Sequence, residues 1–112
     1  MTATTIDHPT AVHATTVEGL HRAALLLREH GHEIPPQALY IVVTGYDRRV
    51  DVQVTKMAGA REQRWALVDR LAQICGNPTP EEHIFQGSLF YASDSRGWHI
   101  YTVDDIAEDG AA

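Results

Sequence analysis

The sequence predicts an α+β fold, αββ followed by αββ, in which a four-stranded antiparallel sheet has two helices packed on one face. Three observations predict it. Two amphipathic stretches each end in glycine, two pairs of β-branched or aromatic runs resemble hairpins, and 112 residues suit one domain. We expect a flexible arm at 1–14, a single domain at 15–103 and an acidic tail at 104–112.

The first helix is expected over residues 16–30. The segment Thr15-Thr16-Val17-Glu18 fits a capping box, and Gly31 is the residue type that favours a helix end because it accepts a positive φ. Apolar residues then recur at helical spacing and are expected to face the sheet: Val17, Leu20, Ala24 and Leu27.

Two hairpins and a second helix account for the rest of the domain. Residues 38–44 and 50–56 are expected to pair around a turn at 45–49, because the first run is β-branched and aromatic and the second alternates. Helix 61–75 ends at Gly76. A capping pattern at 79–82 predicts one helical turn, and 84–91 pairs with 98–103.

The expected core combines the helix stripes with alternate strand positions. Its members are Val17, Leu20, Ala24, Leu27, Leu39, Ile41, Val43, Val50, Val52, Val54, Leu67, Leu71, Ile74, Leu89, Trp98 and Ile100.

Composition excludes several classes of protein. Nine basic against fifteen acidic residues give a net charge of -6, which disfavours a basic protein that coats nucleic acid. The single cysteine, Cys75, excludes an intrachain disulfide and is expected to be buried and inert. No run approaches the roughly 20 apolar residues of a membrane helix. Residues 1–10 carry neither a basic leader nor an apolar stretch, so a cytoplasmic location is expected.

The sheet face opposite the expected core is unusually apolar. It is expected to carry Tyr40, Val42, Phe90, Tyr101 and Val103, which is typical of a binding surface. Two alternatives stay open at this point: the arm or tail covers this face, or the first strand presents its other side. We expect Tyr40, Val42, Phe90 and Tyr101 to bind partners, namely a second copy in a homodimer and an unidentified protein.

A nucleic-acid-binding module is the first alternative function. It would combine the same rings with basic residues from the middle of the chain: Arg48, Arg49, Lys56, Arg61 and Arg64. A solvated helix face with intrahelical ion pairs is the favoured explanation of these charges. The phosphate-binding patterns GxGxxG and GxxxxGK[ST] are absent.

A small enzyme or ligand carrier is the second alternative, with a pocket near His30, His32 and His83. Their spacing matches no recognised metal site, and no GxSxG elbow or other catalytic motif occurs, so we expect no catalytic residue, metal or cofactor. The sequence therefore favours a small non-enzymatic macromolecule-binding module that acts as a homodimer through the outer sheet face.

Overall fold

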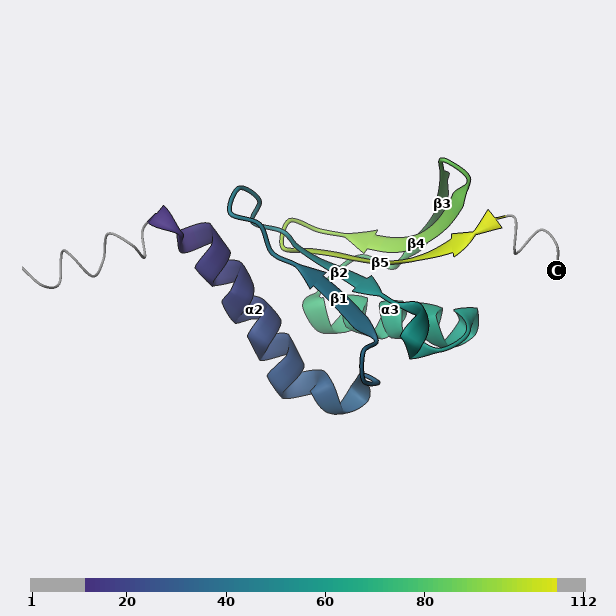
Figure 1. Ribbon diagram of the computed structural model, residues 1–112, viewed down its shortest axis with the longest axis horizontal. Helices are drawn as coiled ribbons and strands as arrows, with labels where there is room; N and C mark the ends of the chain where they lie inside the picture. The colour runs from purple at the N-terminus through teal and green to yellow at the C-terminus, as the bar shows by residue number, and fades with distance from the viewer. Residues whose placement is uncertain (1–11, 107–112) are drawn as a thin grey trace, which may run out of the picture.

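The computed structural model describes residues 12–106, which form two helices and a five-stranded mixed sheet (Figure 1). The expected arm and tail lie mostly outside these residues. The elements in chain order are α2 (Ala14–His30), η1 (Gly31–Glu33), β1 (Leu39–Val42), β2 (Val50–Val54), η2 (Lys56–Ala58), α3 (Arg61–Cys75), β3 (Glu81–Phe85), β4 (Ser88–Asp94) and β5 (Trp98–Asp105). Neither helix within 12–106 is both long and apolar enough to cross a lipid bilayer.

The sheet has the order β1-β2-β5-β4-β3, and β2 and β5 are parallel while the other neighbours are antiparallel. The α+β class is confirmed, but the expectation of four antiparallel strands is wrong. The reason lies in the crossover through α3, which returns the chain to the same end of the sheet. The strand β3 therefore runs in the direction of β2, and two hairpin turns later β5 does so too.

The additional strand is β3, where one helical turn and the start of a longer strand were expected. A tight turn at Gln86 and Gly87, with φ of 51° and 80°, separates β3 from β4. Two successive residues with positive φ are typical of the two-residue hairpin turn whose twist suits antiparallel strands. Glutamine is an unusual residue at its first position, so the sequence shows no clear break there.

The helix α2 packs on the sheet with a different face from the one expected. Its buried residues are Gly19, Ala23 and Leu26. By contrast, Val17 and Leu20 are 49% and 55% exposed, so their assignment to the core is wrong, as it is for Ala24 and Leu27. Small residues decide this orientation, because they let the backbone of α2 approach the sheet closely. A Cβ atom added at Gly19 would lie 2.6 Å from a methyl group of Val43.

The ends of the helices follow the sequence only in part. The helix α2 begins at Ala14 without a side-chain cap, and Gly31 has a φ of -57°, so the chain continues into η1 instead of reversing. The helix α3 ends as expected. Gly76 has a φ of 72°, in the left-handed region that glycine occupies without strain.

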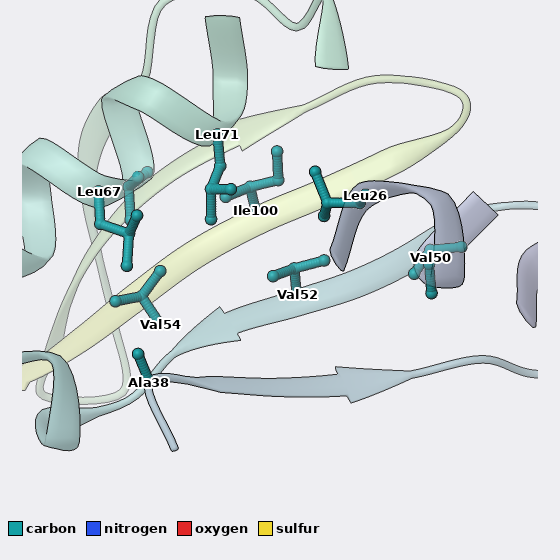
Figure 2. Close-up of a cluster of buried hydrophobic side chains, with 10 residues drawn as sticks. Leu26, Ala38, Val50, Val52, Val54, Leu67, Leu71 and Ile100 are labelled. Carbon is teal, nitrogen blue, oxygen red and sulfur yellow. The ribbon is translucent and has the colours of Figure 1, made fainter. Parts of the chain in front are cut away.

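The core lies between the sheet and the two helices, which cover the same face (Figure 2). Val50, Val52, Val54 and Ile100 from the two central strands are completely or almost completely buried. They contact a cluster that includes Ala23, Leu26, Leu67, Val68 and Leu71. Each fully buried aliphatic side chain of this size contributes about 1.5–3 kcal/mol to folding. Residues of both helices therefore belong to one core cluster with the sheet.

A buried ion pair between Arg64 and Asp104 lies beneath α3. The guanidinium of Arg64 donates to Asp104 at 2.6 Å, to the hydroxyl of Thr102 at 3.1 Å and to the carbonyl of Gly59 at 3.1 Å. Burial by itself raises the pKa of Asp104, but the hydrogen bond and charge of Arg64 outweigh it and hold that pKa below its ordinary value. The strand β5 continues to Asp105, so the first two residues of the expected tail belong to the sheet.

Candidate binding surface

The outer face is the side of the sheet that faces away from both helices. Strand residues alternate between the two faces, and Val52 and Ile100 face the helices, so their neighbours in each strand lie on the outer face. The register of the five strands assigns to it Tyr40, Val42, Asp51, Gln53, Glu81, His83, Phe85, Ser88, Phe90, Ala92, Asp94, His99, Tyr101, Val103 and Asp105. The structure thus brings together the four expected partner-binding residues on one face.

A row of four rings crosses the outer face from β3 to β5. His83 stacks on Phe90 with their centroids 5.1 Å apart, and Phe90 lies 6.1 Å from Tyr101 at a tilt of 35°. His99 stacks on Tyr101 at 4.8 Å. Neighbouring rings hold one another in place, so the row is a preorganised surface that loses little side-chain entropy on binding. The alternation of the sequence already places His99 on this face, whereas His83 was expected near His30 and His32.

Tyr101 is the central ring of the row. Partial burial, followed by the charge of Asp51 and the neighbouring Tyr40, raises the pKa of Tyr101 above its ordinary value. The hydroxyl lies 3.4 Å from the side-chain oxygen of Gln53 on β2. Tyr101 is therefore a neutral hydrogen-bonding group at the middle of an aromatic surface.

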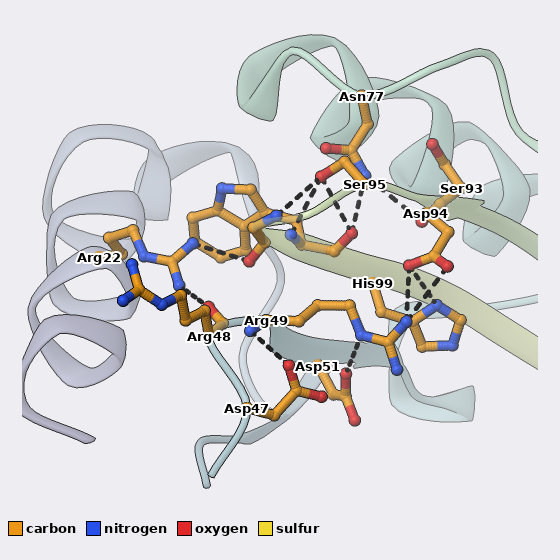
Figure 3. A network of polar contacts seen from close by, with 12 residues as sticks. Arg22, Asp47, Arg48, Arg49, Asp51, Asn77, Ser93, Asp94, Ser95 and His99 are labelled. Carbon is orange, nitrogen blue, oxygen red and sulfur yellow. Dashed lines mark hydrogen bonds and ion pairs between the residues drawn. The ribbon is translucent and has the colours of Figure 1, made fainter. Parts of the chain in front are cut away.

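A charged network borders the row at the start of β2 (Figure 3). The guanidinium of Arg49 bonds both carboxylate oxygens of Asp94, at 2.9 and 3.1 Å, and lies 3.4 Å from Asp51. His99 approaches the same Asp94 carboxylate at 3.4 Å. Because one guanidinium serves two carboxylates, Arg49, Asp51 and Asp94 together give this end of the outer face a negative charge.

A hollow of about 510 Å³ continues this acidic end toward β3. It is lined by residues from β3, β4 and β5 and from the loop before them: Pro78, Thr79, Glu81, Glu82, His83, Ala92, Ser93, Asp94 and His99. Two of the four rings, His83 and His99, therefore face a recess that contains several carboxylates. Such a recess can receive a cationic side chain that approaches the ring row.

The basic residues of the nucleic-acid alternative do not share a surface. Arg48 and Arg49 lie before β2, whereas Lys56 lies after its other end. Arg61 and Arg64 belong to α3, which covers the opposite face of the sheet, and Arg64 is only 4% exposed. The structure therefore separates the five residues that the sequence grouped.

The histidines of the ligand-carrier alternative are separated too. His30 and His32 lie near Glu33 at the end of α2, where the Glu33 carboxylate contacts His30 at 3.0 Å and is also bonded by Arg70. His83 belongs to the ring row on the opposite face. No group of three or more histidine, cysteine or acidic side chains within residues 12–106 is arranged to hold a metal ion.

Cys75 lies on the helix side of the fold, partly buried at the end of α3. Burial raises the pKa of its thiol to about 11, despite the opposing charge of Arg22. The reactive thiolate is thus scarce at neutral pH, which fits the packing role expected from the sequence.

Comparison with models of protein families, with curated proteins and with solved structures finds no match.

Proposed function

We propose that this chain is a small non-enzymatic protein-interaction module that self-associates and presents its outer face to another protein. The row of rings formed by His83, Phe90, Tyr101 and His99 is the observation that carries this proposal. Aromatic side chains provide much of the affinity in protein interfaces, because they bury a large area at a small cost in conformational entropy. Neither helix covers these rings.

The charge of the outer face favours a basic partner. Asp51, Asp94 and Glu81 lie on this face, and the guanidinium of Arg49 is already held between two of them. An arginine or lysine from a partner gains attraction from the carboxylates and from the faces of the rings. We therefore propose a segment of another protein that combines basic and apolar side chains.

The same charge disfavours two other occupants. A second copy bound face to face would bring two acidic surfaces together, so self-association is favoured at another surface of the module. Nucleic-acid phosphates would meet the carboxylates, while the arginines that should neutralise them are separated or buried. A basic segment of another protein meets neither kind of charge repulsion.

A photoreactive phenylalanine analogue at position 90 tests the proposal in the native host. A matched analogue at Tyr46, which is 90% exposed in the β1–β2 turn, is the control. We expect crosslinks from position 90 to basic, apolar segments of other proteins, identified by mass spectrometry of the joined peptides. Replacing Tyr101 by alanine in the same chain is expected to reduce these crosslinks at least fivefold.

Two results would contradict the proposal. The first is an equal set of crosslinked proteins from positions 90 and 46, because that set would reflect exposure alone. The second is a set from position 90 made up only of this chain, because that would mean the outer face is a self-association surface.

A further inference from the structure

The helix α2 carries an apolar stripe that the monomer leaves exposed. We call Val17, Leu20, Ala24 and Leu27 the α2 stripe. The three larger side chains are 49%, 55% and 44% exposed, and Ala24 lies exposed between them. The face of a surface helix that meets water is normally polar. The core already uses another face of α2, so this stripe needs a separate explanation.

The C-terminal end of the stripe lies beside the free edge of β1. A groove of about 230 Å³ joins Leu27 and Gly31 of the helix end to Ala38, Leu39 and Ile41 of the strand. Figure 1 shows α2 running past β1 on the side of the sheet away from β3. A strand added next to β1 would therefore have its helix-facing side chains against the α2 stripe.

The edge of β1 is open for such a strand. Among the described strands, β1 pairs with β2 alone. The amide of Thr55 donates to the carbonyl of Ala38, so hydrogen-bonded pairs with β2 recur at Tyr40 and Val42. The N–H and C=O groups of Leu39 and Ile41 consequently point to the free edge.

This edge also lacks the features that normally keep edge strands apart. The sequence Leu39–Val42 contains no charge, no proline and no bulge. The opposite edge strand, β3, carries Glu81, Glu82 and His83. An unprotected edge beside an unprotected helix stripe indicates an interface.

We propose that two copies of this chain pair their β1 strands antiparallel about a two-fold axis, with the α2 stripes covering the junction. The partner at this site has to supply both a free strand edge and an apolar surface. A second copy has both, and a two-fold axis brings the β1 edge and the α2 stripe of one copy against the same elements of the other. Antiparallel pairing puts Leu39 and Ile41 of both copies on the helix side and Tyr40 and Val42 on the outer side.

The size of the interface requires both elements. A stable dimer buries about 800 Å² on each partner, and a four-residue strand is too small to reach this area without the α2 stripe. The two sheets become one continuous sheet, and both outer faces stay open. The inference rests on the self-association in the proposed function and assigns it to a surface separate from the ring row.

Sedimentation equilibrium of the full chain, from micromolar to millimolar concentration, tests the dimer. Wild type is expected to dimerise, and L20R and L27R are each expected to raise the dissociation constant at least tenfold. Met57→Arg is the matched control, because Met57 is an apolar residue that is 63% exposed on η2 and belongs to neither α2 nor β1. A monomeric wild type, or L20R with wild-type affinity, would overturn the inference.

Amide hydrogen exchange followed by NMR tests the strand pairing independently of affinity. The amides of Leu39 and Ile41 are expected to gain at least tenfold protection as concentration rises, and to lose it in L20R. The amides of Tyr40 and Val42, which β2 binds within one copy, report whether the variant is folded. A dimer in which Leu39 and Ile41 exchange freely would overturn the β1 pairing.

Tyr101→Ala separates this inference from the proposed function. The variant is expected to keep the wild-type dimer while it reduces the partner crosslinks from position 90. A dimer that Tyr101→Ala abolishes and L20R leaves intact would place self-association on the outer face. That result overturns the inference at β1, and it contradicts the proposed use of the outer face for another protein.

Discussion

Arg64 and Asp104 form an ion pair with an N–O distance of 2.6 Å, although their side chains are only 5% and 7% exposed. The pair joins the first turns of α3 to the end of β5. Removing Arg64 leaves the buried Asp104 with Arg61 alone, whose guanidinium lies 3.5 Å from its other oxygen. The loss of the main partner of a buried charge costs about 3–5 kcal/mol in folding free energy.

Arg64→Ala is therefore expected to lower the free energy of unfolding by about 3–5 kcal/mol. Urea denaturation followed by circular dichroism measures the change. Arg28→Ala is the control, because Arg28 lies exposed on α2 and a surface change of this kind shifts stability by about 0.5 kcal/mol or less. Equal losses from the two variants would mean that the buried pair contributes nothing specific.

The environment of the Glu33 carboxylate leads us to expect that the folded state loses stability in acid. Hydrogen bonds from Arg70 and His30 lower its pKa to about 2 from an ordinary value of 4.5. The folded state therefore favours the ionised form, and this stabilisation is complete above pH 4.5 and is lost as pH falls toward 2. Urea midpoints between pH 7 and 2 are expected to fall less steeply in Glu33→Gln than in wild type. Parallel curves would contradict the linkage.

Gly19→Ala tests the close approach of α2 to the sheet. Alanine favours a helix by about 1 kcal/mol over glycine, but the new methyl group would meet Val43. We expect overpacking to prevail, with a net loss of about 1–2 kcal/mol in thermal or urea unfolding. Gly31→Ala is the matched control and is expected to be neutral or stabilising, because nothing lies within 4 Å of its added Cβ. A stabilised Gly19→Ala would disprove the tight contact.

The hydroxyl of Tyr91 is expected to ionise at a higher pH than an ordinary tyrosine. Burial, followed by its hydrogen bond to Asp69, raises the pKa of Tyr91 to about 12, and its ring stacks on Trp65 with centroids 4.1 Å apart. Ultraviolet titration of wild type and Tyr91→Phe isolates its transition from those of the other tyrosines. Asp69→Asn is expected to lower this pKa without restoring the ordinary value of 10, because burial persists. A Tyr91 transition near pH 10 in wild type would refute this environment.

Oligonucleotide binding is expected to be absent at low salt. The outer rings lie among carboxylates, and Arg64 is bound to Asp104. Fluorescence anisotropy with single- and double-stranded probes at 20 and 200 mM salt measures this. An affinity that falls steeply between the two salt concentrations would revive the nucleic-acid alternative.

The sequence by itself determined the elements whose signals are local. The alternation of Val50, Val52 and Val54 depends only on the two-residue period of a strand, and the α3 end at Gly76 depends only on glycine's freedom at positive φ. These rules also assigned Tyr40, Phe90 and Tyr101 to one face of the sheet.

The tertiary structure alone decided how the elements meet. Local patterns do not specify that β5 inserts beside β2, because strand order depends on contacts between distant segments. Local patterns also do not determine which of the two apolar sides of α2 packs on the sheet. The side with Gly19 and Ala23 packs on the sheet because small residues permit a closer approach than Leu20 or Leu27 would. The longer side chains therefore remain on the surface, where the sequence pattern had indicated a core.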